Sequence, residues 1–553
     1  MITTPLRGLL RRRYNASKEQ KRIIEKEIAR FTIADSKKII VLPELKGIQN
    51  TNIVYPLIPP FAYARIRWDE KEQALIYKVD QPSLNEDEKK LLDTISKGLT
   101  KILETNITTL RQKDKLLNYI QKKTNSIIEE YGITLKPGQY TRLMYYTYIN
   151  FVGLNALEPL MHDTYIEDIG CDGVNVPLYV THKKYGNIKT NIYINNLEEL
   201  QEFVVKLAER CGKYISYAEP ILDGCLPDGS RVNATLASDI TTRGPTYSIR
   251  KFRKIPYSII DLVRLKTCTT EELAYLWYVI EHKVNILVCG GTGAGKTSFL
   301  NAIISFIPPE DKIISIEDTQ ELNLPHENWI PSISRMSFGN TNIKGDKYGE
   351  VTMFSLLKES FRQNPDYVII GEVRGTEASV LFQGMASGHP SFGTIHGGSV
   401  DDIIKRMQTP PINLSPGLLE TLDIVIVVSR AAQYGKSSRR LKSISEIESI
   451  DAATGRSRVI KSFQWSPGDD KHEKHKSYVL EKISADYGIP ITLMEKEIED
   501  KKQLIEWLHQ KRISNFTEVS SYIAKYYKNK KHIMKQVKKD IPQEITKEEI
   551  LAT

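Results

Sequence analysis

Cysteine is scarce in this sequence and is not grouped. Among the 553 residues there are five cysteines, far apart and without a C-x-x-C pair: Cys171, Cys211, Cys225, Cys268 and Cys289. An odd number of scattered cysteines provides neither a disulfide framework nor the paired ligands of a structural zinc site. We therefore expect a protein of a reducing compartment that holds no zinc.

Long apolar runs are lacking as well. No stretch approaches the roughly 18 consecutive apolar residues of a membrane-spanning helix. The basic start of the chain, with its cluster Arg11, Arg12 and Arg13, is not followed by the apolar region of a signal peptide. The sequence therefore predicts a cytoplasmic protein that touches a membrane only through partners or charge. From this cluster to about Ala34 we expect an amphipathic helix, which serves either docking or contact with a membrane surface.

A strong charge imbalance is also absent. The chain has 77 basic and 68 acidic residues, so its net charge of +9 is too mild an excess to identify a partner. Basic residues do gather near the end of the chain, at Lys528, Lys530, Lys531, Lys535, Lys538 and Lys539. This tail is either a solvated helical appendage or a contact for acidic lipid or a protein. We do not expect nucleic acid as a partner, although charge alone leaves a translocase open.

The sequence does contain a complete glycine-rich turn between a buried strand and a helix. An apolar run over residues 285–289 leads into the pattern G-x-x-x-x-G-K-T, and an apolar helical stripe follows from Phe299. In such a turn the backbone N–H groups cradle phosphates, the lysine reaches the β and γ oxygens, and the threonine ligates Mg²⁺. The predicted binding residues for ATP and Mg²⁺ are Gly290, Gly291, Thr292, Gly293, Ala294, Gly295, Lys296, Thr297 and Ser298.

Three later strands are expected to end in polar side chains. Residues 312–316 lead to Glu317, residues 367–371 lead to Glu372, and His389 and His396 flank a third short run. The carboxyl ends of parallel strands lie on the ligand side of an open α/β sheet. Glu372 stands where P-loop ATPases usually carry an aspartate, so it either holds the metal through water or orients a water itself. The two histidines lack a third ligand for zinc, and each taken alone is more often structural.

The chain is long enough for several domains, and strands alternate with helices after the turn, which predicts a three-layer α/β core. We predict four segments: a mixed domain of helices and a hairpin over residues 1–135, a second α/β domain over 136–258, the P-loop ATPase domain over 259–450, and a charged helical extension over 451–553. Within the first, strands at 53–66 and 74–79 form the hairpin, and a capping pattern at Ser83 and Glu86 starts a helix.

Arginines gather at the end of the second segment. Arg231, Arg243 and Arg250 stand shortly before the phosphate-binding domain. Any one of them is ordinarily a solvated or salt-bridged residue. As a group they suit the γ-phosphate, because the planar guanidinium matches phosphate oxygens, and the same or another subunit could supply them.

Four of these motifs follow one another in an order and spacing that we recognise. The chain resembles the secretion-superfamily ATPases of type II secretion, type IV pili and the archaellum, and most of all their archaeal branch. Their Walker A motif matches residues 290–297, the aspartate box 316–321, the atypical Walker B motif 362–372 and the histidine box 388–396. The bacterial secretion members carry a tetracysteine zinc module that this sequence lacks.

The resemblance implies a RecA-like P-loop core preceded by a smaller, PAS-like α/β domain and an N-terminal mixed α/β domain. By resemblance Glu317 polarises the attacking water and Glu372 arranges Mg²⁺, while His389 and His396 couple the γ-phosphate to domain movement. The three arginines named above match those with which the family closes over nucleotide. Members of the family are usually hexameric rings. They dock on a polytopic membrane platform protein at the inner face of the cell membrane and act indirectly on pilin-like filament subunits.

The predicted function is ATP hydrolysis that drives assembly or secretion of type IV pilus-like filaments. A DNA-transfer or DNA-uptake ATPase of the same superfamily is one alternative, and a nucleotide-gated scaffold is another. The sequence names neither the filament nor the direction of the motor, and it does not establish the number of subunits.

Overall fold

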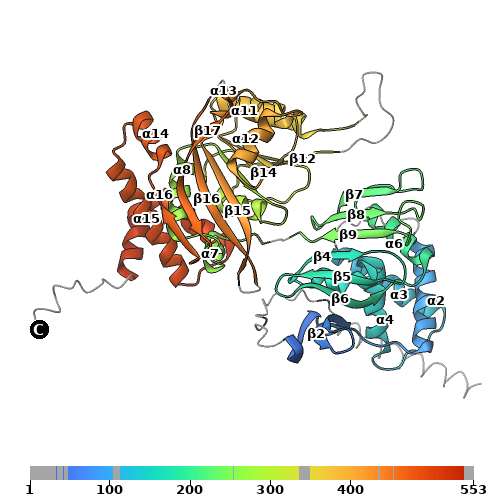
Figure 1. The fold of residues 1–553 in the computed structure, drawn as a ribbon. Helices are drawn as coiled ribbons and strands as arrows, with labels where there is room; N and C mark the ends of the chain where they lie inside the picture. The colour runs from blue at the N-terminus through green and yellow to red at the C-terminus, as the bar shows by residue number, and fades with distance from the viewer. Residues whose placement is uncertain are drawn as a thin grey trace, which may run out of the picture. The chain divides into compact units, whose positions relative to one another are not determined.

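The computed structural model describes the structure of residues 31, 33, 42, 48–103, 113–252, 255–335, 349–433, 436–451 and 454–540. The chain divides into two units, Met1–Phe252 and Arg253–Thr553 (Figure 1). The basic cluster at Arg11 and the amphipathic helix predicted after it lie outside the described residues. Among the described helices, none is long and apolar enough to cross a membrane.

The first unit is built on one nine-stranded sheet in the order β1-β2-β3-β6-β5-β4-β9-β8-β7. Its strands are β1 (Asn52–Ile58), β2 (Ala62–Asp69), β3 (Ala74–Asp80), β4 (Ile166–Cys171), β5 (Pro177–His182), β6 (Gly186–Tyr193), β7 (Ile221–Cys225), β8 (Arg231–Thr235) and β9 (Thr246–Arg250). Buried and more exposed residues alternate along β5, β8 and β9. One face of the sheet therefore carries the core and the other is open, as is common in antiparallel sheets.

The helices of this unit are α2 (Glu86–Leu103), α3 (Lys113–Glu130), α4 (Gln139–Thr147), α5 (Glu158–His162) and α6 (Leu197–Arg210), with short turns η1 (Ile48–Asn50), η3 (Tyr148–Val152) and η4 (Asn155–Leu157). Helix α6 turns an apolar stripe to the core, with Leu200, Phe203, Val204, Leu207 and Ala208 buried. Helix α2 has a capping box two residues later than predicted. Asn85 accepts the Glu88 N–H at 2.9 Å, and the Glu88 carboxylate accepts the Asn85 N–H at 3.0 Å. Asparagine caps a helix as well as serine does.

The predicted strand over residues 53–66 is two strands. Pro59 and Pro60 interrupt it, because proline has no N–H to donate to a sheet ladder. The chain turns there, with the Phe61 N–H donating to the Ile58 carbonyl at 2.7 Å. The predicted hairpin across residues 69–72 is confirmed and joins β2 to β3.

The two predicted N-terminal domains are one unit. Strand β3 of the first pairs with β6 of the second, in the register Ile76 to Lys189. A single hydrophobic cluster runs from Phe31 to Ile249. At its centre the carboxylate of Asp163 accepts hydrogen bonds from the buried hydroxyls of Tyr55 and Tyr77, both at 2.6 Å. Residue 135 is therefore not a boundary between compact bodies, because sheet pairing and core cross it.

The second unit holds the phosphate-binding turn in a sheet of order β12-β11-β13-β14-β10-β15-β16-β17-β18. Its strands are β10 (Ile286–Gly290), β11 (Ile313–Glu317), β12 (Trp329–Ile333), β13 (Tyr367–Val373), β14 (Ser391–His396), β15 (Ile424–Gln433), β16 (Lys436–Ile450), β17 (Ser457–Ser466) and β18 (Lys471–Lys474). From β12 to β15 neighbouring strands are parallel, and β15 to β18 are antiparallel.

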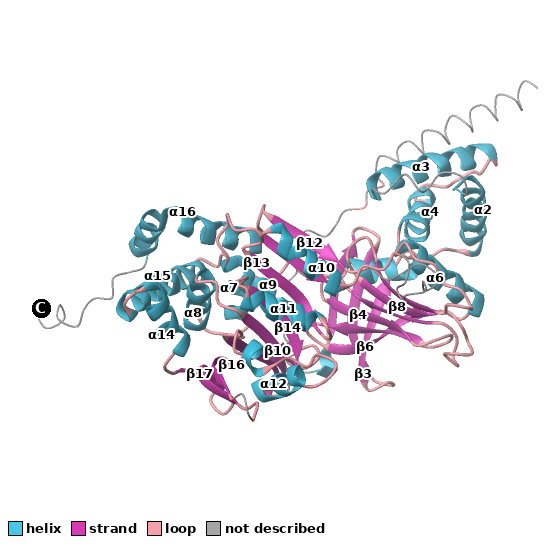
Figure 2. Cartoon of the chain, turned by 90° about the horizontal axis from the view of Figure 1, so that it is seen from above, coloured by secondary structure: helices cyan, strands magenta, loops and turns pink. Residues whose placement is uncertain are grey.

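Helices cover both faces of this sheet (Figure 2). They are α7 (Ile259–Arg264), α8 (Thr270–Glu281), α9 (Lys296–Ile303), α10 (Met353–Ser360), α11 (Glu377–Ala386), α12 (Val400–Gln408), α13 (Pro416–Leu419), α14 (Tyr478–Tyr487), α15 (Ile491–Gln510) and α16 (Phe516–Asp540), with short turns η5 (Ile304–Phe306) and η6 (Phe361–Gln363). Along β10, Ile286 and Val288 belong to one hydrophobic cluster and Leu287 and Cys289 to the other. A sheet buried on both faces explains the continuous apolar runs of its strands. The predicted α/β class with a RecA-like P-loop core is confirmed.

The predicted C-terminal extension is part of the second unit. Strand β17 pairs with β16 across the predicted boundary at residue 450, and α14 to α16 share a hydrophobic cluster with α8 and α9. Lys501 of α15 is completely buried, donates to Glu281 at 2.8 Å and to Glu497 at 3.0 Å, and lies 5.4 Å from the centre of the Trp277 ring. The high charge of this segment predicts a separate appendage. The apolar stripes of these helices pack instead on the core of the second unit, which covers them.

A close contact under α11 gives a test of this packing. A Cβ atom at Gly384 would lie 2.1 Å from the ring of Phe361, whereas one at Gly417 meets nothing within 4 Å. We expect Gly384→Ala to lower the free energy of unfolding by about 1–3 kcal/mol because it overpacks the core. Gly417→Ala is the matched control and should change stability by at most about 1 kcal/mol, towards stabilisation. Denaturant unfolding measures both. Equal stability of the two variants would contradict the packing of α11 on Phe361.

Candidate active site

The phosphate-binding turn lies at the carboxyl end of the central strand β10. Gly293 and Gly295 have backbone φ angles of +69° and +91°, in the left-handed region that glycine adopts without strain. A Cβ at Gly290 would lie 2.3 Å from the Val428 carbonyl oxygen of the neighbouring strand β15, so this first glycine is required by the close approach of β15. Helix α9 begins directly after the turn, at Lys296. The backbone therefore forms the cradle that the sequence predicts, with a helix N-terminus aimed at it.

Beside this cradle the structure brings together the lysine that begins α9, a histidine from β14 and a glutamate from β13. The Nζ atom of Lys296 lies 3.3 Å from Nδ1 of His396, and Nε2 of His396 lies 2.7 Å from Oε1 of Glu372. His396 is the last residue of β14, which lies beside β10, and Glu372 is on β13, the next strand. Arg374 extends the connection, at 2.5 Å from Glu372 and 3.7 Å from Asp318.

The protonation state of this group follows from its chemistry. Burial, together with the Lys296 cation, lowers the pKa of the His396 imidazole, although Glu372 opposes the shift. A neutral imidazole has one donor and one acceptor nitrogen. An ammonium only donates, so Nδ1 accepts from Lys296 and the imidazole proton lies on Nε2, the nitrogen 2.7 Å from the Glu372 carboxylate. Burial also lowers the pKa of the Lys296 ammonium.

Glu317 ends β11, one strand farther from the turn than Glu372. Three strand spacings separate β11 from β10, about 14 Å of sheet. The Glu317 side chain is 2% exposed, and its carboxylate accepts the N–H groups of Glu321 at 3.0 Å and Leu322 at 3.1 Å. Burial raises the pKa of Glu317 to about 7, while these two backbone hydrogen bonds lower it. A carboxyl group that titrates near neutrality suits proton transfer from water.

Gly371 explains why this second acidic strand departs from the usual aspartate. A Cβ atom at Gly371 would lie 2.8 Å from Cγ of Glu317. The Glu317 side chain therefore occupies the space that a side chain at 371 would need, and the acid of β13 comes one residue later, at Glu372.

The structure does not bring His389 to this site. His389 precedes β14, at the opposite end from His396, so the two lie about 23 Å apart along an extended chain. The His389 ring packs at 4.9 Å from the ring of Phe361, and the backbone N–H of His389 donates to the Gly384 carbonyl at 3.0 Å. Its predicted role in sensing phosphate does not fit this position, because ligands bind at the carboxyl ends of parallel strands. It is a packing residue of the far edge.

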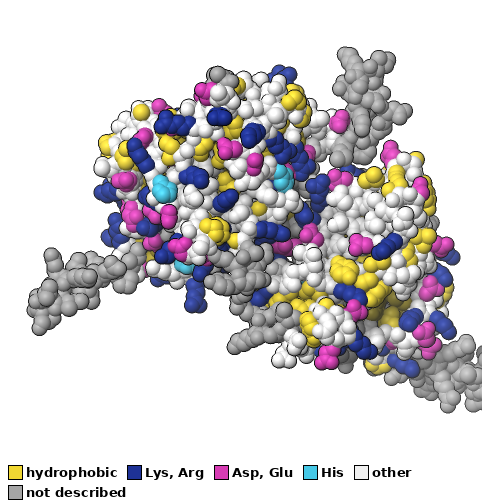
Figure 3. All heavy atoms as spheres, in the orientation of Figure 1, with side chains coloured by type: hydrophobic (Ala, Val, Ile, Leu, Met, Phe, Trp, Pro, Cys, Tyr) yellow, Lys and Arg dark blue, Asp and Glu magenta, His cyan; other side chains and the backbone are white. Residues whose placement is uncertain are grey.

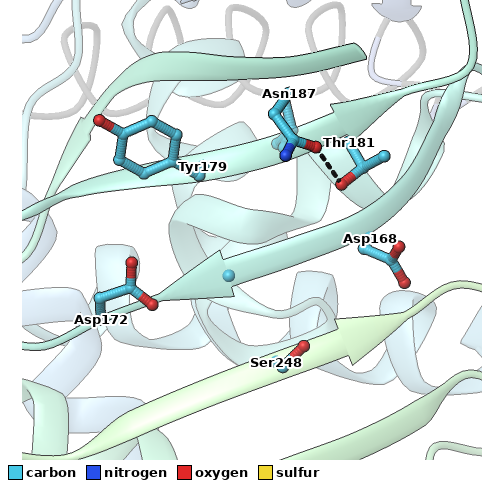
Figure 4. A pocket seen from close by; sticks show the side chains of 8 residues that line it. Asp168, Asp172, Tyr179, Thr181, Asn187 and Ser248 are labelled. Carbon is cyan, nitrogen blue, oxygen red and sulfur yellow. Dashed lines mark hydrogen bonds between the residues drawn. The ribbon is translucent and has the colours of Figure 1, made fainter.

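Two of the three predicted arginines of the first unit lie side by side. Arg231 on β8 and Arg250 on β9 are direct partners in the ladder. Each is paired with an acid, Arg231 with Asp223 and Arg250 with Asp168, both at 3.0 Å. Asp168 lines a shallow hollow on the sheet, formed by strands β4, β5, β6 and β9 (Figure 4). Arg243 lies beyond the other end of β9, where its carbonyl accepts the Val174 N–H at 2.9 Å. Only Arg231 and Arg250 therefore form a pair of cations.

The sequence analysis missed two arginines that contact the turn itself. Arg430 on β15 and Arg439 on β16 both donate to the carbonyl oxygen of Gly293, at 3.1 Å and 3.4 Å. Arg430 lies within β15 and Arg439 within β16, so neither stands at the end of a buried strand, which was the signal for Glu317 and Glu372.

The donor set at the mouth of the turn fits a magnesium ion. Thr297, the second residue of α9, offers a hydroxyl oxygen, and Glu372 offers a carboxylate. Mg²⁺ prefers such oxygen donors and keeps several waters beside one or two carboxylates. These two residues would hold it, and bound there it would neutralise charge on phosphate oxygens. Ser298, the last of the predicted binding residues, is exposed on α9.

Comparison with known proteins agrees with this geometry. The family described as "Type II/IV secretion system protein" matches residues 191–465, which include the turn and the strands that carry Glu317, Glu372 and His396. A protein of Methanocaldococcus jannaschii is 35% identical over 514 residues, covering 88% of this chain and 90% of that protein. The chain belongs to the type II/IV secretion system protein family. It is similar over most of its length to this archaeal protein, as its motifs predict.

Two further matches cover less of the chain. The conjugal transfer protein TrbB of Rhizobium radiobacter is 30% identical over 41% of this chain and 68% of that protein. The crystal structure of the VirB11 ATPase from the Brucella suis type IV secretion system matches 52% of this chain and 92% of that chain, with 23% identity and a TM-score of 0.27. A likeness this low says nothing about the activity of the secretion family member described here.

The raised pKa of Glu317 predicts a pH-dependent effect on stability. The unfolded carboxyl releases its proton near pH 4.5 and the folded one only near 7, so this group favours unfolding above pH 4.5, fully so above 7. Glu317→Gln removes this penalty and keeps the acceptor for both N–H groups. We expect it to stabilise the protein by up to about 3 kcal/mol at pH 8, and the gain should vanish near pH 4.5. Denaturant unfolding at several pH values measures it, and a gain independent of pH would contradict the shift.

Proposed function

We propose that this chain hydrolyses ATP and that hydrolysis drives assembly or secretion of type IV pilus-like filaments at the cytoplasmic membrane. One observation carries the proposal. The lysine of the phosphate-binding turn is joined through a neutral histidine to the carboxylate of Glu372 on another strand. A ligand that draws Lys296 towards itself removes the donor from His396 and so changes the hold on Glu372. Phosphate occupancy is thereby transmitted across two strands.

The catalytic steps are electrostatic and positional. Lys296 and the N–H groups at the start of α9 neutralise phosphate oxygens. Glu317 accepts the proton of the attacking water, for which its pKa of about 7 is suited. Its carboxylate is buried under the loop that carries Glu321 and Leu322. This loop has to move before a water reaches Glu317, so we propose that hydrolysis waits for a conformational change.

The first unit supplies that change in our proposal. Arg231 and Arg250 form a pair of cations held by Asp223 and Asp168. A phosphate competes well for a guanidinium, because the planar fork matches its oxygens. We propose that these arginines leave their acids and close over nucleotide, either in the same subunit or in the next one of a homo-hexameric ring. A polytopic membrane protein would dock this ring at the inner face of the membrane.

Substitutions at the site separate binding from turnover. We expect Lys296→Ala to abolish nucleotide binding and hydrolysis. Glu317→Gln should keep ATP affinity within about twofold and reduce kcat by about 100-fold or more, as the loss of a general base does. In the unmodified protein kcat should fall as the pH is lowered, since Glu317 must be deprotonated to accept a proton.

Phosphate release under multiple turnover measures these effects, with binding of a fluorescent nucleotide in parallel. His389→Ala is the control for these substitutions and should leave kcat nearly unchanged, because His389 precedes β14 at the end opposite to the site. Binding of ATP without turnover by the unmodified protein would replace the motor with a nucleotide-gated scaffold. Hydrolysis retained by Glu317→Gln would remove Glu317 from its role.

A DNA-transfer role is the second candidate, favoured by the likeness to a conjugal transfer protein. On the face of the second unit drawn in Figure 3, Lys and Arg side chains are interspersed with Asp and Glu, which gives no support for a nucleic-acid stripe there. Binding to single-stranded DNA with a steep salt dependence would favour this candidate. Loss of surface filaments in cells that carry Lys296→Ala would favour the filament motor instead.

A further inference from the structure

Two arginines that neither the motifs nor the proposed mechanism uses lie against the phosphate-binding turn. Arg430 and Arg439 are direct partners in the β15–β16 ladder. Both donate through Nε to the carbonyl oxygen of Gly293, at 3.1 Å and 3.4 Å. A Cβ at Gly293 would lie 2.8 Å from the guanidinium of Arg430, and a Cβ at Gly295 would lie 3.1 Å from Cδ of Arg439. Each positive-φ glycine of the turn is thus covered by one arginine.

The arginines lie on the opposite side of the turn from the catalytic group. Strand β10 has β14 on one side and β15 on the other. His396 and Glu372 approach from β14 and β13 and meet Lys296 there. Arg430 and Arg439 approach from β15 and β16. The lysine of such a turn reaches the β and γ oxygens of a bound nucleotide. Since Lys296 lies on the β14 side, the β15 side faces the next phosphate towards the ribose, which is the α-phosphate.

Within the described residues, little negative charge compensates the two arginines. Among the described residues neither forms an ion pair with a carboxylate, whereas the adjacent Arg440 is paired with Asp470 at 2.7 Å. Two guanidinium groups share a single neutral carbonyl oxygen. A guanidinium binds a phosphate oxygen more strongly than a neutral acceptor, because a charge-assisted hydrogen bond is roughly twice as strong. Arg430 is exposed and Arg439 half-buried, so an anion can reach both.

We propose that Arg430 and Arg439 clamp the α-phosphate of a bound nucleoside di- or triphosphate. In the conformation described they hold the turn through Gly293, and on binding they turn their free N–H groups to the phosphate. This inference rests on the proposed nucleotide-binding function of the turn. The two arginines then contribute to the affinity for nucleotide and not to the chemical step. ADP and ATP share the α-phosphate, so both nucleotides should depend equally on the clamp.

The test compares ADP and ATP binding by titration with fluorescent analogues of each, in the full chain. We expect Arg430→Ala and Arg439→Ala each to weaken both nucleotides by about tenfold, a usual effect of losing one hydrogen bond to a charged group. Each variant should also lessen the dependence of binding on salt, and kcat at saturating ATP should stay within about twofold. Arg430→Lys should recover part of the affinity. Arg458→Ala is the matched control, because Arg458 is exposed on β17 of the same sheet and paired with Glu448.

Several outcomes overturn the clamp. If ATP binding weakens and ADP binding does not, the arginines contact the γ-phosphate. If the variants lower the melting temperature of the nucleotide-free protein more than Arg458→Ala does and leave the salt dependence unchanged, they only support the turn. Unchanged affinity excludes contact with nucleotide. The proposed function fails separately, when Lys296→Ala retains full ATP binding. In that case the turn is not the nucleotide site, whatever the arginine variants show.

Discussion

A neutral imidazole between an ammonium and a carboxylate connects the parts of this site. His396 accepts from Lys296 only while Nδ1 carries no proton, and partial burial together with the Lys296 cation lowers the pKa of the imidazole beside Glu372. The arrangement depends on the sheet, because three parallel strands must end at the same edge for these side chains to meet. It depends also on the glycines of the turn, since Gly290 lets β15 approach and Gly293 and Gly295 allow left-handed backbone. Fold and chemistry are therefore set by the same few close contacts.

Much of this site could be predicted from the sequence. Apolar runs, and the glycines and prolines that interrupt them, indicate the turn at Gly290, the strands that end at Glu317 and His396, and the helix Glu377–Ala386. Such patterns are local, because a buried parallel strand must be apolar throughout and a phosphate cradle must be rich in glycine. The family follows from the same motifs, since their order along the chain is visible without any coordinates.

Other features depend on contacts between distant residues. His389 belongs to the same motif as His396, but a strand separates them, and only its direction shows which one meets Lys296. The pairing of β3 with β6 joins the two predicted N-terminal domains into one unit, and no local sequence pattern indicates this pairing. Burial of Lys501 among Trp277, Tyr278 and Tyr526 draws the charged C-terminal helices into the second unit. Composition alone could not predict this burial, because one of the two glutamates that compensate the charge of Lys501 is Glu281, 220 residues away in the chain.

The space shared by Gly371 and Glu317 has a consequence for how such a site changes over time. The side chain of Glu317 fills the volume that a side chain at 371 would need, so a larger residue at 371 conflicts with a side chain as long as glutamate at 317. A relative that regains a bulky acid at the former position must shorten or redirect the latter. Positions 317 and 371 are therefore constrained as a pair by the volume between their two strands.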